Sequence, residues 1–123
     1  MAIGVLSRRI LVVDDEPLIR WCISETLGAA GYGIAEAQDA ASALKALAEM
    51  PEPDVILLDF RLPDSSDLGL LERIRGVAPA AAVIMMTAFG TPEVTAAALS
   101  LGARAVLTKP FDMQDLEHVV RSL

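Results

Sequence analysis

The sequence is poor in the residues that stabilise small secreted proteins or that bind nucleic acids. It contains one cysteine, Cys22, in 123 residues, so an internal disulfide is excluded and a reducing compartment is favoured. Its 10 Lys and Arg residues are outnumbered by 17 Asp and Glu residues, whereas binding of a phosphate backbone normally needs a basic face. No apolar run approaches the ~20 residues of a membrane-spanning helix, and the apolar stretch at residues 2–6 is too short for a secretory signal. We therefore expect a cytoplasmic protein that binds neither a membrane nor, directly, nucleic acid.

The length and the apolar content predict one folded domain. Hydrophobic residues make up 54% of the sequence and charged residues 22%, a balance that excludes a disordered chain. A chain of 123 residues has the size of one domain rather than two. Because no linker, repeat or low-complexity tract interrupts it, we expect a single domain over residues 1–123, with its core beginning near residue 9.

The apolar pattern alternates between two periods along the chain. Short apolar runs, typical of strands buried on both faces, occur at residues 10–13, 55–58, 83–86 and 105–107, with a weaker strand near 32–36. After each run, apolar residues recur at helical spacing. Five strands alternating with five helices predict a parallel sheet with helices on both faces. We therefore predict an α/β protein with the flavodoxin-like doubly wound (βα)5 fold and a five-stranded sheet in the order 2-1-3-4-5.

Individual residues mark the expected helix ends. Pro17 suits the first turn of the first helix, and Gly28 and Gly31 are expected to mark the end of that helix. The later helices have N-cap residues at three expected starting points, Asp39, Thr91 and Asp112.

Charged and hydroxyl residues stand at the carboxyl ends of four predicted strands. Open α/β sheets bind ligands beyond these ends, and the four strands are neighbours in the proposed order. We therefore expect one site at this edge of the sheet, formed by Asp14 and Asp15 after the first strand, Asp59 after the third, Thr87 after the fourth and Lys109 after the fifth.

This set of residues favours phosphoryl-transfer chemistry. Three carboxylates in one pocket raise one another's pKa unless a cation compensates their charge. Mg²⁺ suits such a site because it takes one or two carboxylates and keeps several waters. A carboxylate beside Mg²⁺, a hydroxyl and an ammonium can act as nucleophile while the other groups neutralise the phosphoryl oxygens.

At these positions the sequence resembles the receiver domains of bacterial two-component response regulators. The resemblance extends from about residue 9 to the last residue and is carried by Asp14-Asp15, Asp59 with Leu62-Pro63 behind it, Thr87-Ala88 and Lys109-Pro110. It implies a phosphorelay in which a sensor histidine kinase donates the phosphoryl group of a phosphohistidine to Asp59. It also implies a regulatory domain that catalyses only its own phosphorylation and slow autodephosphorylation, and is otherwise not an enzyme.

The resemblance further implies roles for the residues around the acceptor. The implied Mg²⁺ ligands are Asp15, Asp59, the backbone carbonyl of Arg61 and, through water, Asp14. The implied phosphoryl contacts are Thr87 and Lys109, with the small Ala88 leaving room for the group. The Lys109–Pro110 bond is expected to be cis, a state tolerated mainly before proline.

Residues 87–93 are similar to receivers that stand in front of transcription activators or DNA-binding domains. This similarity implies transcriptional control through an output domain that the chain does not contain. The expected readout face covers the fourth helix, fifth strand and fifth helix, residues 91–121, and this face is also where a homodimer is expected to form.

Two positions depart from the family pattern. Val106 stands where receivers usually carry an aromatic residue that turns inward during switching, and valine cannot make that movement. We therefore predict that the signal passes instead through Thr87, Phe89 and the loop and helix that follow. Asp67 replaces a frequent glycine, so the loop after Asp59 is expected to differ in shape, with consequences for phosphoryl lifetime.

Other functions remain as alternatives. A pseudo-receiver that binds partners without phosphorylation is supported only by Val106. A haloacid-dehalogenase-type phosphatase would need Asp-x-Asp after the first strand and a larger body, and a flavin carrier would need a phosphate-binding loop there. Taken alone, the acids after the first strand could simply be solvated residues that favour a helix dipole. His118 is interpreted as a surface residue and Cys22 as a small core residue.

Overall fold

The computed structural model describes residues 8–65, 68–88 and 90–123, and within them five strands alternate with five helices. None of the helices in these ranges is long and apolar enough to cross a bilayer. The elements are β1 (Arg9–Val13), α1 (Pro17–Ala29), β2 (Gly33–Ala37), α2 (Ala40–Glu49), β3 (Val55–Asp59), α3 (Gly69–Val77), β4 (Ala82–Thr87), α4 (Pro92–Ser100), β5 (Ala105–Thr108) and α5 (Met113–Arg121).

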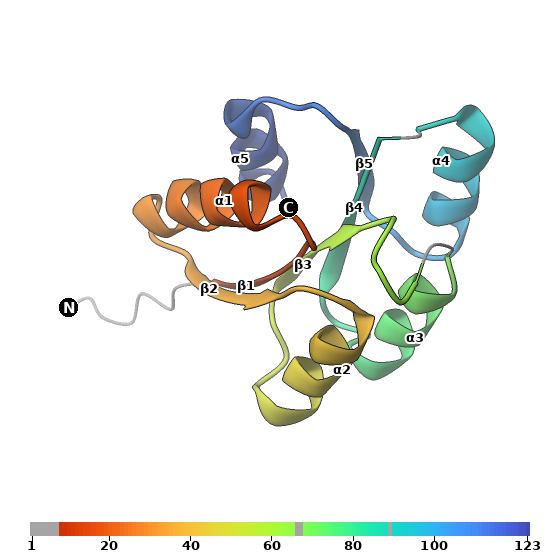
Figure 1. Ribbon diagram of the computed structural model, residues 1–123, viewed down its shortest axis with the longest axis horizontal. Helices are drawn as coiled ribbons and strands as arrows, with labels where there is room; N and C mark the ends of the chain where they lie inside the picture. Colours follow the sequence, from red (N-terminus) through yellow and green to blue (C-terminus); the bar gives the residue numbers. More distant parts are fainter. Residues whose placement is uncertain (1–7, 66–67, 89) are drawn as a thin grey trace.

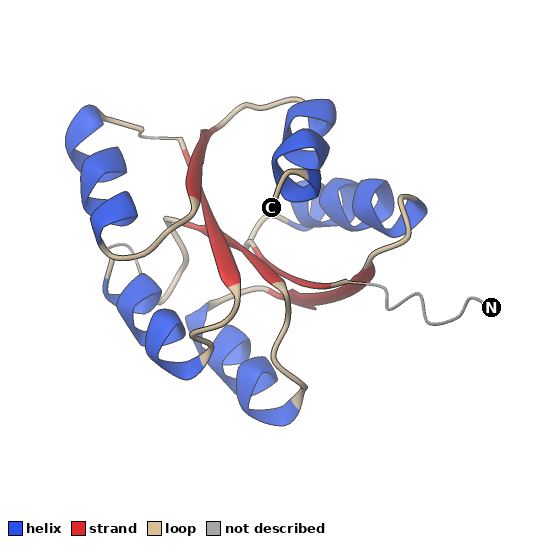
Figure 2. Ribbon diagram, turned by 180° about the vertical axis from the view of Figure 1, so that it is seen from behind, coloured by secondary structure: helices blue, strands red, loops and turns tan. Residues whose placement is uncertain are grey.

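The strands form one parallel sheet in the order β2-β1-β3-β4-β5. Helices α1 and α5 cover one face of the sheet, and α2, α3 and α4 cover the other (Figures 1 and 2). The sequence prediction of fold class and strand order is therefore confirmed. β1 and β3 are central strands, so their carboxyl ends lie side by side where the chain order of the strands reverses.

Alternate residues of each central strand supply two separate cores. Leu11, Ile56 and Val83 pack with α2 and α3, whereas Val12 and Leu57 pack with α1 and α5. Because side chains alternate across a pleated strand, a strand covered on both faces needs apolar residues at every position. This requirement explains the continuous apolar runs of the sequence.

The helix caps agree with the sequence at two of three positions. Asp39 accepts a hydrogen bond from the Ser42 N–H in a capping box, and Thr91 accepts one from the Val94 N–H. Asp112 occupies the N-cap position of α5 but makes no side-chain cap hydrogen bond, so that prediction is wrong in detail. Helix α1 continues one residue past Gly28 to Ala29, and Gly31, with a φ of +101°, follows the helix end as predicted.

The turn after α4 depends on Gly102, which has a φ of +104°. A Cβ added to Gly102 would lie 2.7 Å from Nε of Arg75. Arg75 donates hydrogen bonds to the carbonyls of Pro79 and Ala81, at 3.0 and 3.1 Å. The arginine therefore ties the end of α3 to the start of β4 and packs closely over the glycine.

We expect Gly102→Ala to destabilise the protein more than Gly31→Ala. Gly31 has a similar φ of +101°, but an added Cβ there meets nothing within 4 Å. Gly31→Ala should cost the backbone strain alone, about 1–2 kcal/mol, while Gly102→Ala must also displace Arg75. Urea unfolding of both variants measures the difference. When Arg75 is already alanine, the further loss caused by Gly102→Ala should fall to that of Gly31→Ala. Equal losses for the two glycine variants would contradict this explanation.

Candidate functional site

Three aspartates meet at the carboxyl ends of β1 and β3. Asp14 and Asp15 directly follow β1, Asp59 is the last residue of β3, and the register pairs Val13 with Leu58. One carboxylate oxygen from each aspartate lies within 4.8 Å of the others. Asp14 and Asp59 are buried, and Asp15 is exposed. The expected convergence of these side chains is therefore present.

Asp14 is held by contacts at every polar group. Its N–H donates to the Ala37 carbonyl of β2 at 3.1 Å. Its carboxylate Oδ1 accepts from the Glu16 N–H, and Oδ2 accepts from Nζ of Lys109, both at 2.9 Å. A fully buried carboxylate requires such partners, because burial without them is costly.

Lys109 is the cation that faces the aspartates. Its backbone N–H donates to the Thr87 carbonyl at 2.7 Å, which extends the alignment of β5 on β4. Its Nζ lies 3.4 Å from Oδ2 of Asp59 and 3.7 Å from Oε1 of Glu16. Burial alone would lower the pKa of Lys109, but the hydrogen bond and charge of Asp14, together with Asp59, raise it. The bond from Lys109 to Pro110 is cis, as expected.

Asp59 has a raised pKa. Burial disfavours its charged form and the neighbouring Asp14 charge adds to this effect, while Lys109 and the N–H of Arg61 oppose it. The pKa rises to about 6. The Arg61 N–H donates to Oδ1 of Asp59 at a long 3.4 Å. One ammonium thus does not fully compensate the clustered carboxylates, and a further cation would be favoured there.

These groups surround a pocket of about 310 Å³ at the edge of the sheet. Thr87 is buried at the end of β4, and Ala88 is exposed beside it. The donor set consists of hard oxygen ligands at close spacing, which fits a small divalent cation such as Mg²⁺. The residues that line the pocket are Asp15, Glu16, Asp59, Arg61, Thr87, Ala88 and Lys109.

The loop after Asp59 is anchored to α2 through Asp64. The Asp64 carboxylate accepts hydrogen bonds from the N–H groups of Ala40 and Ala41, at 2.8 and 3.0 Å. These two bonds lower the pKa of Asp64. Leu62 and Ser65 exchange backbone hydrogen bonds within the same loop. Asp67, where the sequence departs from the family pattern, lies outside the described residues, so its predicted effect stays a prediction.

Of Val106 and Phe89, the two residues singled out for switching, the structure describes only Val106. Val106 is half-buried on β5 and packs against the core formed with α2 and α3. Phe89 lies outside the described residues. The predicted route through Thr87 and Phe89 stays a prediction.

Sequence reasoning missed two residues at this site. Glu16 lines the pocket and lies within ion-pair distance of Lys109; its place in the acidic run after β1 was the available signal. Arg20 donates a hydrogen bond from Nη1 to the Asp14 carbonyl at 2.7 Å. Helical periodicity places Arg20 one turn after Glu16, but nothing in the sequence indicates which carbonyl it meets.

A doubly wound sheet with clustered aspartates and a facing lysine at its carboxyl edge defines a class of signalling domain. Residues 10–121 match the family model of the response regulator receiver domain, and the chain belongs to that family. The receiver domain protein (CheY-like) from Methanospirillum hungatei JF-1 superimposes with a TM-score of 0.89 at 29% identity, covering 95% of this chain and 93% of that one. The BeF3-activated DrrB receiver domain gives 0.85 at 27% identity, covering 95% and 97%.

The curated relatives are longer proteins. A protein described as a probable transcriptional regulatory protein, TcrX of Mycobacterium tuberculosis, is 38% identical over 114 residues, which cover 93% of this chain and 48% of TcrX. The DNA-binding transcriptional regulator NtrC of Escherichia coli is 38% identical over 109 residues, which cover 89% of this chain and 23% of NtrC. The chain thus spans half or less of these two relatives, which are both named as regulators of transcription.

Proposed function

We propose that this domain receives a phosphoryl group on Asp59, with Mg²⁺ as cofactor, and thereby transmits a signal. The observation that carries the proposal is the position of Asp59, buried at 7% exposure in a pocket with two further aspartates and the Lys109 ammonium. A carboxylate in this setting faces the pocket and has a cationic group, the Lys109 ammonium, beside it. Such a group is suited to act as a nucleophile.

Asp15, Asp59 and the Arg61 carbonyl would bind the ion directly, and Asp14 would act through water. When bound, Mg²⁺ neutralises charge on the phosphoryl oxygens. Asp14 has a second task, since it fixes the Lys109 ammonium at 2.9 Å. Lys109 would then contact a phosphoryl oxygen, while Thr87 donates its hydroxyl to another and Ala88 leaves space beside it.

In the transfer, an Asp59 carboxylate oxygen attacks the phosphorus of a phosphohistidine in line with the leaving nitrogen. The P–O bond forms as the P–N bond breaks, and the released imidazole takes up a proton. The raised pKa of Asp59, about 6, leaves the carboxylate ionised at neutral pH. Hydrolysis of the acyl phosphate by an in-line water returns the free carboxylate.

A sensor histidine kinase is the proposed donor. Apolar residues stand exposed on α1, the helix that begins directly after the pocket residue Glu16, with Leu18 at 71% and Trp21 at 57% exposure. A neighbouring apolar hollow lies between the start of α1 and the segment after β5, lined by Ile19, Phe111 and Met113 among others. These surfaces support docking of a partner whose phosphohistidine must reach Asp59.

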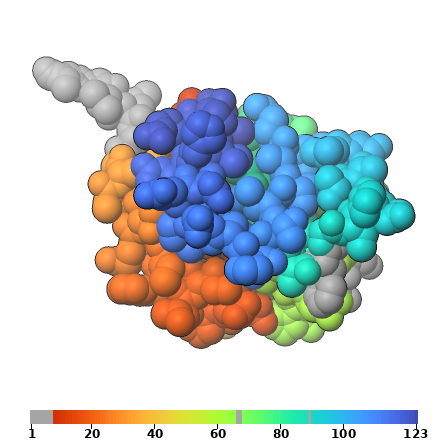
Figure 3. All heavy atoms as spheres, turned by 90° about the horizontal axis from the view of Figure 1, so that it is seen from above, coloured from red at the N-terminus to blue at the C-terminus, as the bar shows by residue number. Residues whose placement is uncertain are grey.

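The proposed output surface is the face of α4, β5 and α5. Figure 3 looks onto this face, where the residues of α4 lie beside those of β5 and α5. Leu99 is an exposed apolar residue of α4, and it supports partner binding or homodimerisation there. We propose that residues 9–123 act as one receiver domain that controls a transcriptional output domain, as the names of the relatives suggest.

Incubation with acetyl phosphate and Mg²⁺ should add one phosphoryl group to the protein, measured by intact mass. The gain should vanish when Mg²⁺ is chelated and in Asp59→Asn. Asp54→Asn is the matched control, because Asp54 precedes β3 at the opposite end of the strand; it should still be phosphorylated. A folded protein that neither gains mass nor binds beryllofluoride would exclude the proposal and favour the phosphorylation-independent pseudo-receiver.

A further inference from the structure

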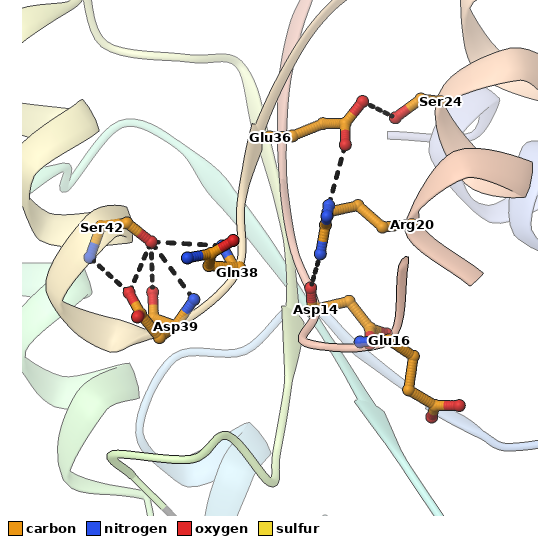
Figure 4. A network of polar contacts seen from close by, with 8 residues as sticks. All are labelled: Asp14, Glu16, Arg20, Ser24, Glu36, Gln38, Asp39 and Ser42. Atoms are coloured by element: carbon orange, nitrogen blue, oxygen red, sulfur yellow. Dashed lines mark hydrogen bonds and ion pairs between the residues drawn. The ribbon is translucent and has the colours of Figure 1, made fainter. Parts of the chain in front are cut away.

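Arg20 connects three elements of the fold behind the acidic pocket. Its Nη1 donates to the Asp14 carbonyl at 2.7 Å and its Nε donates to Oε1 of Glu36 on β2 at 2.8 Å. The other oxygen of Glu36 accepts from the Ser24 hydroxyl of α1 at 2.9 Å. Figure 4 shows the chain of contacts from Ser24 through Glu36 and Arg20 to Asp14.

The contact to Asp14 falls at the point where the pairing of β1 ends: the Asp14 N–H still donates to the Ala37 carbonyl of β2, and the Asp14 carbonyl accepts from Arg20. Val13 is the last residue of β1 paired with β3, and the Asp14 carbonyl belongs to the peptide unit that leads into Asp15. Because the peptide unit is planar, the direction of this carbonyl sets the course of the backbone at Asp15. The guanidinium therefore contacts the peptide unit that directly precedes the Asp15 side chain.

Arg20 is itself held in one orientation. Its side chain is 17% exposed. Glu36 accepts a hydrogen bond from Nε of the planar guanidinium, and the Asp14 carbonyl accepts one from Nη1. An arginine can serve both partners because its donors form a rigid fork. A lysine ammonium is a single charged point on a flexible stem and cannot reproduce that fork.

We propose that Arg20, oriented by Glu36 and Ser24, is a positioning residue that sets the geometry of the Asp15 carboxylate for Mg²⁺ binding. The proposal rests on the function proposed above, in which Asp15 binds the ion. Arg20 contributes through the backbone of Asp14 and does not touch the ion or the phosphoryl group. Residues that orient metal ligands in this way typically change metal affinity by about 10–100-fold.

The sign of the effect separates positioning from simple electrostatics. Removal of a positive charge near a cation site should tighten Mg²⁺ binding if charge alone matters. Loss of the carbonyl contact should weaken it. We expect Arg20→Met to raise the Mg²⁺ dissociation constant about tenfold, measured by isothermal titration calorimetry on the whole chain, and Arg20→Lys to recover little of the affinity.

Two further variants guard against a purely structural explanation. Arg121→Met also removes an arginine with an acidic neighbour, Glu117 at 4.0 Å, but away from the pocket, and should leave the dissociation constant unchanged. Glu36→Gln should weaken Mg²⁺ binding less than Arg20→Met does. Because Glu36 acts through Arg20, the double variant Arg20→Met/Glu36→Gln should bind as weakly as Arg20→Met alone.

The outcomes are distinguishable. An Arg20→Met variant that folds, by circular dichroism, and binds Mg²⁺ as tightly as the wild type overturns the inference, as does full recovery in Arg20→Lys. If Arg20→Met does not fold, unchanged affinity in Glu36→Gln overturns it. A wild-type protein that does not bind Mg²⁺ would instead refute the proposed function, and the inference with it.

Discussion

Replacing Lys109 with methionine should lower the free energy of unfolding of the metal-free protein by about 3 kcal/mol. Lys109 is 12% exposed and its Nζ faces the carboxylates of Asp14, Asp59 and Glu16. Asp14 is fully buried, so the variant leaves a buried carboxylate without its cation. Methionine retains most of the apolar stem, which restricts the change mainly to the ammonium. Urea unfolding followed by circular dichroism measures the loss.

The double variant Lys109→Met/Asp14→Asn tests this cause. Removal of both members of a buried ion pair costs less than removal of one, because no unpaired charge remains. We therefore expect the double variant to be more stable than Lys109→Met alone. Mg²⁺ should also restore part of the stability of Lys109→Met, since the ion stabilises the state that binds it. A double variant that loses the sum of the two single losses would contradict the explanation.

The second large effect has the opposite sign: Asp59→Asn should stabilise the metal-free protein at neutral pH. The pKa of Asp59 is raised from 3.8 to about 6, so the folded state holds its proton more tightly than the unfolded state does. Such a shift would correspond to about 3 kcal/mol in a fully dry site. Because the pocket opens to water, we expect a gain of about 1–2 kcal/mol.

The pH dependence follows from the direction of the shift. Below pH 3.8 the carboxyl is protonated in both states and carries no penalty. As the pH rises from about 4 to about 6, the wild type loses stability relative to Asp59→Asn. Above pH 6 the full difference persists. Urea unfolding of both proteins without metal, at pH 4 and pH 7.5, measures this difference.

Asp64→Asn is the matched comparison with the reverse expectation. Its pKa is lowered by the N–H groups of Ala40 and Ala41, so the ionised form stabilises the fold. The asparagine variant should be less stable than the wild type at pH 7.5, and the difference should decrease as the pH falls below the usual range of an aspartate. If Asp59→Asn also lowered the stability at pH 7.5, the assignment of Asp59 as a carboxylate whose ionised form destabilises the fold would be wrong.

The two main predictions describe one property of the pocket. Asp59 costs stability and Lys109 offsets part of that cost through contacts with the same carboxylates. Functional sites typically contain ionisable groups whose charged form lowers the stability of the folded protein. This imbalance is what a bound divalent cation would relieve, and it is consistent with the proposed dependence of phosphorylation on Mg²⁺.

The sequence alone determined the architecture and most of the residues of the pocket. A parallel sheet covered on both faces requires continuous apolar runs in its central strands. The runs at residues 10–13, 55–58 and 83–86 are typical of such strands. Once the strand order is 2-1-3-4-5, the residues that follow the strands must meet at one edge. For that reason the sequence alone predicts that Asp14, Asp59 and Lys109 lie together. The N-cap roles of Asp39 and Thr91 could also be predicted from the sequence, because each side chain bonds to an N–H only three residues away.

Only the tertiary structure decided which groups pair within and behind the pocket. The ion pair of Lys109 with Asp14 joins residues 95 positions apart, and the Asp64 bonds to α2 span 23 and 24 positions. The link of Arg20 to Glu36 spans 16 positions and crosses from a helix to a strand. Local periodicity places each residue on an element, but side-chain pairing and burial depend on how distant elements pack. The raised pKa of Asp59 arises from that packing, because both burial and the Asp14 charge are properties of the assembled sheet edge.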